Sequence, residues 1–321
     1  MHVPFLHACT FGFMEKRGFS ALPQWRESLR QMAVETGCNA VALPVTALME
    51  HTYSTRIDFT SPAVVSREDI LAVVEEARAL GLRVILKAMV NCRDGYWRAY
   101  IRFFDRDVPG EPTWGEWFAS YEVFVFYLAD IAREIDADLF CIGCETVGTD
   151  HRETEWRRLI SGVRARFSGP ITYNCDKYQE DLVRWWDAVD LISSSGYYPL
   201  DTLDENLQRI KRVAESFDRP FLFMEAGCPS RQGSEYLPNN WQHPGPTDAQ
   251  AQQRWYDAMC QGILRYPFIR GVCWWDWPAT RLYPKALGPE QNGYCVFGKP
   301  AAQTLKAFSG LVRTNENGGA S

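Results

Sequence analysis

Eight short apolar segments alternate with amphipathic segments along the 321 residues, and this alternation predicts a single (β/α)8 barrel, an α/β fold. The apolar segments show almost no polar alternation, as expected for parallel strands that are buried on both faces. An open doubly wound sheet usually has fewer strands. No Pro/Gly/Ser-rich linker divides the chain. We therefore expect one domain over residues 1–312 and a polar, disordered tail over residues 313–321.

The predicted strands are short apolar runs bounded by turn residues. LRVILKAMV is the clearest of them, because almost no polar residue interrupts it. In chain order the predicted strands are Val3–Cys9, Cys38–Val45, Leu82–Val90, Ala137–Glu145, Pro170–Asp176, Val189–Tyr198, Pro220–Gly227 and Ile269–Trp277.

The predicted helices follow these strands one by one. Gly37 ends the first helix, and a Ser-Arg-Glu-Asp capping pattern from Ser66 begins the second, which ends before Gly81. A long insertion over Asn91–Pro112 precedes the third. In chain order the predicted helices are Leu22–Thr36, Ser66–Leu80, Trp114–Ile135, Thr154–Phe167, Glu180–Ala188, Asp204–Phe217, Asp248–Leu264 and Pro300–Val312.

Composition narrows the possible partners. With 34 basic and 40 acidic residues the net charge is −6, which argues against binding of a nucleic-acid backbone. No apolar run is long enough for a membrane helix. The first residues resemble a strand and not a secretory signal, so we expect a cytoplasmic protein, or a secreted one if a leader has been removed. Most of the ten cysteines lie in apolar segments, which is typical of buried free thiols.

Two glutamates end otherwise apolar predicted strands. In (β/α)8 barrels the active site lies at the carboxyl ends of the strands. Glu145 closes DLFCIGCE and Glu225 closes FLFMEAG. A carboxylate at the end of a buried strand is costly unless it is paired, hydrated or functional. A structural salt bridge explains one such residue as well as catalysis does, but two of them favour a catalytic pair.

A pair of carboxylates across a barrel mouth is what glycoside hydrolysis requires. One protonates the leaving oxygen, and the other attacks the anomeric carbon. The aromatic content of 14% also suits this chemistry, since sugar rings stack on Trp and Tyr. Trp274 and Trp275 are candidates for such stacking, and neighbouring strand residues point to opposite faces, so at most one of the two faces the lumen.

The whole chain resembles the large retaining clan of (β/α)8 glycoside hydrolases, and within it family 113, whose characterised members are β-1,4-mannanases. Six segments carry the resemblance and together span most of the sequence. They are VNCRDGYWRAYIRF, FCIGCETVGTDHRETEWRRLI, ITYNCD, WWDAVDLISSSGYYPL, RPFLFMEAGCPSRQGS and VCWWDW.

The resemblance implies that Glu145 is the acid/base and Glu225 the nucleophile of a two-glutamate double displacement. It also implies that Tyr198 or Tyr197 hydrogen-bonds the nucleophile; we assign Tyr198 to catalysis and Tyr197 to substrate binding. Trp274 or Trp275 would form the platform under the sugar. The remaining residues implied to line the cleft are Lys87, Asn91, Trp97 and Asn174.

One position departs from the wider clan. Many clan members carry Asn immediately before the acid/base glutamate, where it bonds the sugar 2-hydroxyl. This chain has Cys144 there. The contact must come from another residue or be absent, and this weakens any inference about the sugar.

The sequence therefore predicts a retaining glycosidase that acts on mannan or manno-oligosaccharides, with no metal and no organic cofactor. Its expected partner is the oligosaccharide or polysaccharide substrate, with neither nucleic acid nor membrane. Four alternatives stay open: a β-glucan or xylan substrate, transglycosylation, a carbohydrate-binding barrel without catalysis, and a metal-dependent hydrolase. The five histidines do not follow metal-ligand spacing, and Cys141 and Cys144 would point to opposite faces of a strand.

Overall fold

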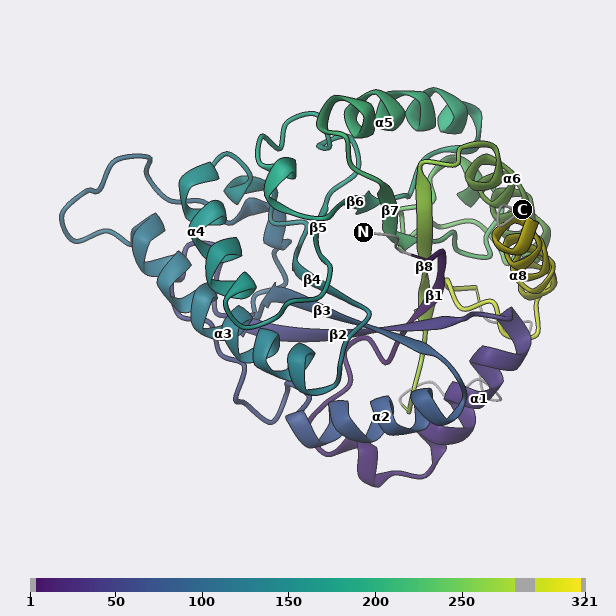
Figure 1. Cartoon of the computed structure of the whole chain (residues 1–321), viewed down its shortest axis with the longest axis horizontal. Coiled ribbons are helices and arrows are strands. Elements are labelled where there is room, and N and C mark those ends of the chain that lie inside the picture. The colour runs from purple at the N-terminus through teal and green to yellow at the C-terminus, as the bar shows by residue number, and fades with distance from the viewer. Residues whose placement is uncertain (1–3, 281–291, 319–321) are drawn as a thin grey trace.

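The computed structural model describes residues 4–280 and 292–318, and its strands close into one parallel barrel in the order β1 to β8 (Figure 1). The (β/α)8 prediction is confirmed. The strands are β1 (Leu6–Phe11), β2 (Ala40–Met49), β3 (Arg83–Cys92), β4 (Leu139–Cys144), β5 (Ile171–Cys175), β6 (Leu191–Ser195), β7 (Phe221–Ala226) and β8 (Ile269–Trp277).

The helices form a ring outside the barrel. In Figure 1, α1 and α2 lie at the bottom, α3 and α4 at the left, α5 at the top, and α6 and α8 at the right. Their bounds are α1 (Gln24–Thr36), α2 (Arg67–Ala79), α3 (Trp114–Glu134), α4 (Glu153–Arg164), α5 (Leu203–Phe217), α6 (Ala249–Arg265) and α8 (Pro300–Gly318).

Local sequence signals fix several helix ends. The Ser66 side chain accepts the Asp69 N–H and Asp69 accepts from the Ser66 backbone, which is the capping box that the sequence predicts. Thr113 and Glu116 make the same arrangement at the start of α3. Gly37 ends α1 with a left-handed backbone, φ 67°.

The helix predicted over Glu180–Ala188 is wrong. Between β5 and β6 the chain forms turns and one 3₁₀ turn, Trp186–Ala188. The Glu180 side chain is fully buried and accepts from Ser194 Oγ at 2.8 Å and Arg209 Nη2 at 2.7 Å. These tertiary contacts hold the segment in place of a helix. At the other end of the chain, α8 continues past Val312 to Gly318, and residues 319–321 of the predicted tail lie outside the described residues.

Nine of the twelve tryptophans are fully buried, so most of the aromatic excess is structural. Trp156 stacks on Trp185 with ring centroids 4.8 Å apart, between α4 and the segment that follows β5. All ten cysteines are buried and free, as predicted. None of the helices in the described ranges is long and apolar enough to cross a bilayer.

Asp150 lies inside this aromatic layer, and we expect it to make stability depend on pH. Its Oδ1 accepts from Tyr173 Oη at 2.5 Å, while Oδ2 has no partner in the described part of the chain. Burial raises the pKa of Asp150 to about 8, so the folded chain holds a proton that the unfolded chain loses above about pH 4. The free energy of unfolding should therefore fall as pH rises from about 4 to about 8, by roughly 1.4 kcal/mol per pH unit.

The matched variant is Asp150→Asn, which is neutral at every pH and keeps the oxygen that accepts from Tyr173. Urea unfolding at pH 5, 6, 7 and 8 should show a clearly smaller loss of stability in this variant than in the wild type. Parallel curves for the two proteins would show that Asp150 is already ionised in the fold.

Candidate active site

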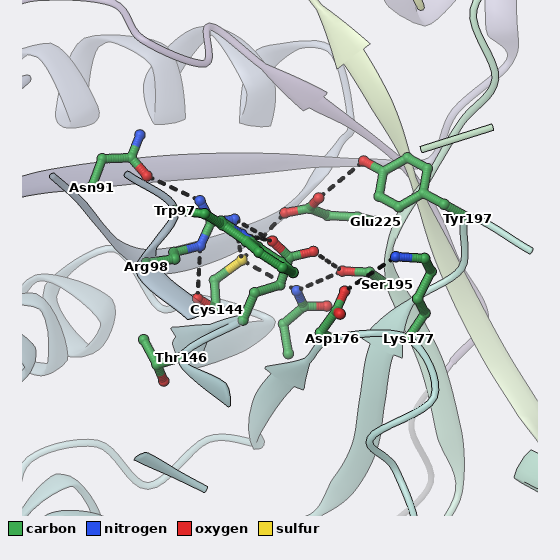
Figure 2. Close-up of polar contacts among 12 residues, drawn as sticks. Asn91, Trp97, Arg98, Cys144, Thr146, Asp176, Lys177, Ser195, Tyr197 and Glu225 are labelled. Carbon is green, nitrogen blue, oxygen red and sulfur yellow. Dashed lines mark hydrogen bonds and ion pairs between the residues drawn. The ribbon is translucent and has the colours of Figure 1, made fainter. Parts of the chain in front are cut away.

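The two glutamates singled out by the sequence lie together at the carboxyl end of the barrel. Glu145 directly follows β4 and Glu225 lies in β7, and only 7% and 3% of their surfaces are exposed. Figure 2 shows Glu225 pointing into a group of polar side chains from β3, β4 and β6. Two buried carboxylates at one place require compensating donors, and the surrounding residues supply them.

Glu225 is held by three donors, two of which, Tyr197 and Cys144, are labelled in Figure 2. Lys87 Nζ lies 2.5 Å from Oε1, Tyr197 Oη donates to Oε2 at 2.9 Å, and the Cys144 thiol donates to Oε1 at 3.3 Å. Burial acts to raise the pKa of this carboxyl, but the charges of Lys87 and Arg98 and the hydrogen bonds outweigh it and leave the pKa below its ordinary value. Glu225 is therefore ionised at neutral pH.

The pairing of β6 with β7 puts Tyr197 beside Glu225. Ser195 is in register with Glu225, and the Gly196 N–H donates to the Glu225 carbonyl at 2.6 Å. A Cβ on Gly196 would come within 2.6 Å of the Phe223 ring, so this close approach requires glycine. The chain then turns and brings the next side chain, Tyr197, within hydrogen-bond distance of the Glu225 carboxylate.

Glu145 leaves the strand with a left-handed backbone, φ 52°, which is uncommon for a residue other than glycine. Its side chain accepts three hydrogen bonds. Arg98 Nη2 lies 2.6 Å from Oε2, Trp97 Nε1 lies 3.3 Å from Oε2, and Ser195 Oγ lies 2.5 Å from Oε1. The strained backbone therefore turns the carboxylate toward donors from two segments, the insertion after β3 and the end of β6.

Arg98 comes from the inserted segment after β3, and the fold holds it firmly. Its Nε donates to the Cys144 carbonyl and its Nη1 to Asn91 Oδ1, both at 2.9 Å. The segment packs closely on the turn after β4, where a Cβ on Gly148 would lie 2.0 Å from the Ile101 carbonyl oxygen. Glycine at 148 thus permits the contact that brings Arg98 to Glu145.

Cys144 connects the two halves of the site. Its Sγ accepts from Arg98 Nη2 at 3.3 Å and from Asn174 Nδ2 at 3.2 Å, and its hydrogen goes to Glu225. Burial raises the pKa of this thiol well above its ordinary value, so it stays a neutral S–H. One small neutral side chain therefore separates the Arg98–Glu145 pair from the Lys87–Glu225 pair.

Comparison with known proteins identifies the family. A model of glycoside hydrolase family 113 matches residues 9–299. The chain belongs to glycoside hydrolase family 113. A solved family 113 β-1,4-mannanase is 43% identical with a TM-score of 0.93, over 96% of this chain and 99% of that one. A family 113 β-mannanase from Alicyclobacillus acidocaldarius, in complex with ManMIm, is 39% identical with a TM-score of 0.91, over 96% and 98% of the two chains.

More distant matches share only the fold. A β-glucuronidase from Ruminococcus gnavus is 15% identical with a TM-score of 0.62, over 95% of this chain and 50% of that one. A search of curated proteins found no match.

In this family 113 glycosidase the assignment of Tyr198 to the nucleophile is wrong. The Tyr198 hydroxyl donates to Glu180, next to Arg209, and the ring is fully buried against Phe223. Tyr197 and Tyr198 leave the end of β6 in opposite directions, so only Tyr197 reaches Glu225. Sequence alone left the two open because the chain turns at Gly196.

Trp274 is likewise not a cleft residue. Only 2% of its surface is exposed, and it packs against His7, Tyr256 and Phe308 on the helix side of β8. Trp275 faces the opposite way, with its ring 4.5 Å from that of Phe13 and 6.0 Å from Lys87 Nζ. Of the two tryptophans, Trp275 is therefore the candidate platform.

The other predicted cleft residues all lie within this network. Lys87 contacts Glu225, Trp97 contacts Glu145, and Asn91 holds Arg98. Asn174 donates to Cys144 and to Ser195 Oγ at 3.2 Å, and its Oδ1 has no partner in the described ranges.

Sequence reasoning missed Arg98 and Ser195. Arg98 lies in an irregular loop, where no periodicity reports whether a side chain points inward. Ser195 had a usable signal, because three consecutive serines interrupt an otherwise apolar strand. Small polar residues at the end of a buried strand are suited to a polar lumen.

Two further carboxyls beside the pair titrate near neutral pH. Burial, and then the charge of Glu145, raises the pKa of Asp176 to about 7. Burial, and then the charge of Glu225, raises the pKa of Asp276 to about 7. Both are thus protonated in mildly acidic solution, which limits the negative charge at the site. Each adds to the loss of stability expected as pH rises from about 4 to about 7.

The two neighbouring tyrosines give a matched pair of variants. Tyr197→Phe removes a donor to the ionised Glu225, and we expect it to lower kcat/KM about 10- to 100-fold with little change in Tm. Tyr198→Phe removes a donor to buried Glu180, and we expect it to cost about 1–3 kcal/mol of stability while kcat/KM changes less than about threefold. Kinetics and thermal unfolding of both variants test this. The opposite pattern would indicate that Tyr198, and not Tyr197, hydrogen-bonds Glu225.

Proposed function

We propose that this chain is a retaining β-mannanase that hydrolyses β-1,4-mannosidic bonds in mannan or manno-oligosaccharides. The observation that carries the proposal is the pair of buried glutamates at the ends of β4 and β7, each held by its own cation, Arg98 for Glu145 and Lys87 for Glu225. Two carboxyl groups at one cleft are the machinery of a glycoside hydrolase. The choice of sugar is supported by the solved family 113 β-1,4-mannanases.

In the first step Glu225 attacks the anomeric carbon and forms a covalent glycosyl-enzyme. Lys87, Tyr197 and Cys144 hold its carboxylate ionised and fix its direction, so little reorientation is needed before attack. The charge on Glu225 decreases as the new bond forms, and the lowered pKa of this group supports its role as the ionised partner.

Glu145 transfers the protons. It gives one to the departing glycosidic oxygen in the first step and takes one from water in the second. Ser195, Arg98 and Trp97 hold its two oxygens in one orientation throughout. Trp97 is 38% exposed, so one donor to Glu145 lies at the solvent edge of the site.

Trp275 supplies the platform for the sugar at the cleaved position. It is partly exposed, its ring is braced by Phe13, and it lies in β8 next to the strand that carries Glu225. An apolar ring face beside the nucleophile suits the C–H face of a pyranose. Asn91, through Arg98, and Asn174, through Cys144, complete the polar network around the two glutamates.

We also propose that the enzyme works in the cytoplasm on short manno-oligosaccharides. Ten free, buried cysteines support a reducing compartment. Cys9 Sγ and Cys38 Sγ lie 3.3 Å apart without a disulfide bond.

The test is hydrolysis of β-1,4-manno-oligosaccharides by the wild-type chain, with cello- and xylo-oligosaccharides in parallel and the anomeric form of the first product followed by NMR. Cleavage of the mannosides with a β-configured first product supports the proposal. Preferential cleavage of another series would leave the glutamate pair in place and overturn the substrate. An α-configured first product would contradict the retaining mechanism.

A further inference from the structure

Lys87 is a buried ammonium with fewer partners than donors. It lies on β3 with none of its surface exposed, and its Nζ donates to Glu225 Oε1 at 2.5 Å. Among residues 4–280 and 292–318, Glu225 is its one hydrogen-bond acceptor. An ammonium carries three donors, and buried donors without acceptors are costly. The remaining donors of Lys87 therefore favour an oxygen atom of a bound molecule.

The other donors around Glu225 are already used. The Tyr197 hydroxyl and the Cys144 thiol have one hydrogen each, and both donate to Glu225. Arg98 donates through Nε to the Cys144 carbonyl and through Nη2 to Glu145. Lys87 is thus the group in contact with the nucleophile that has donors left for a ligand.

The position of Lys87 limits which ligand oxygen it reaches. Its Nζ lies over the face of Trp275, 6.0 Å from the ring centroid, and in direct contact with Glu225. A sugar that stacks on Trp275 while Glu225 attacks its C1 therefore has Lys87 beside the bond that forms. Two sugar oxygens lie near that bond, the ring oxygen and the hydroxyl on C2. The ring oxygen gains positive charge in the oxocarbenium-like transition state, so a cationic donor favours the C2 hydroxyl. This step rests on the proposed function, because it takes Glu225 as the nucleophile.

We propose that Lys87 donates a hydrogen bond to the C2 hydroxyl of the sugar whose anomeric carbon Glu225 attacks. Hydrogen bonds to this hydroxyl strengthen in the transition state of glycoside hydrolysis. The short side chain of Cys144, committed to Glu225, leaves this contact to the ammonium. Lys87 is then a specificity-determining residue that makes the rate depend on the substituent at C2.

The experiment uses two aryl β-1,4-mannobiosides that differ only in whether the sugar attached to the aryl group carries its C2 hydroxyl. Each kcat/KM is divided by the spontaneous hydrolysis rate of the same substrate, since the 2-deoxy sugar is intrinsically more reactive. The ratio of hydroxyl to deoxy values is measured for the wild type, Lys87→Met, Lys87→Arg and Tyr197→Phe. The Tyr197 variant is the matched control, because it also removes one donor to Glu225.

In the wild type the ratio should be at least about 10, the effect of one hydrogen bond from a charged donor. In Lys87→Met the ratio of hydroxyl to deoxy values should fall to within about threefold of 1. Lys87→Arg, which retains a charged donor, should keep part of the ratio. Tyr197→Phe should lower both rates and leave the ratio unchanged. A role of Lys87 confined to Glu225 would lower both rates equally and would not move the ratio.

A wild-type ratio near 1 overturns the proposal without any variant, as does an unchanged ratio in a folded Lys87→Met. Should Lys87→Met fail to fold, Lys87→Gln takes its place in the same comparison. If the enzyme prefers glucosides, the mannanase proposal fails. The corresponding aryl β-1,4-glucobiosides, with and without the C2 hydroxyl, then test the role of Lys87 separately.

Discussion

Glu225→Gln is expected to lower kcat for manno-oligosaccharides about 10⁴-fold or more, because it replaces the ionised carboxylate that we propose forms the glycosyl-enzyme. Glutamine fills the same space and keeps a carbonyl oxygen for Tyr197 or Lys87, so the fold should persist. Removing one charge leaves Lys87 as a buried ammonium without its carboxylate, and Tm should fall by a few degrees.

The measurement is the initial rate of mannotriose hydrolysis, followed as reducing ends, with the far-UV CD spectrum as the check on folding. Glu235→Gln is the matched control. Glu235 is also a buried glutamate paired with an arginine, Arg254, but it lies in the turn after β7. It should leave kcat within about threefold of the wild type. If kcat fell to a similar extent in the two variants, the Glu225→Gln result would reflect removal of any buried charge and not loss of the nucleophile.

Glu145→Gln should have an effect that depends on the leaving group. With a sugar as leaving group, loss of the proton donor is expected to reduce kcat/KM about 10²- to 10⁴-fold. With a dinitrophenyl leaving group, which departs without a proton, kcat/KM should fall less than about tenfold. The later step, in which water must be activated, still needs Glu145, so kcat should fall and KM should fall with it.

Azide provides the complementary test of this role. A small anion can attack the glycosyl-enzyme without a general base, so azide should restore turnover of the dinitrophenyl substrate by Glu145→Ala and give a β-glycosyl azide. An α-glycosyl azide would instead indicate that position 145 holds the nucleophile. Equal losses with both leaving groups would contradict the assignment of Glu145 as acid/base.

The barrel and its pair of buried glutamates follow from strong, local sequence signals. β8 has the predicted bounds, Ile269–Trp277, because its apolar run is sharply bounded. Both glutamates stand out as charges at the ends of buried strands, and burial of a charge is costly wherever it occurs. The carboxyl ends of parallel strands meet at one face of a barrel, so two such charges are brought together by topology alone.

The orientation of single side chains was harder to predict, because it depends on register. β6 and β7 shift register between Ser194 and Ser195, and β1 and β8 shift between Cys9 and Phe11. Such a shift changes which member of an adjacent pair faces the lumen. The pairs Tyr197 and Tyr198, and Trp274 and Trp275, stand beside these irregularities. Alternation predicts that the members of a pair point apart but not which one points inward.

The Arg98–Glu145 pair was missed for a different reason. It joins residues 47 positions apart, one of them in an irregular insertion. The contact depends on the close approach of Gly148 to the Ile101 carbonyl, a tertiary feature without a local pattern. Of the two cations that pair with the glutamates, Lys87 lies on a strand and Arg98 lies in a loop segment. A prediction based only on the residues at strand ends therefore misses Arg98.

Double displacement requires that Glu225 become covalently bonded to the sugar. This bond can be trapped with 2-deoxy-2-fluoro-β-mannosyl fluoride, whose glycosyl-enzyme forms faster than it hydrolyses. Intact-mass analysis of the inactivated enzyme, followed by peptide mapping, should find one fluoromannosyl group per chain, on Glu225. A label on Glu145 or on Asp276, or inactivation of the Glu225→Gln variant at the wild-type rate, would contradict the account.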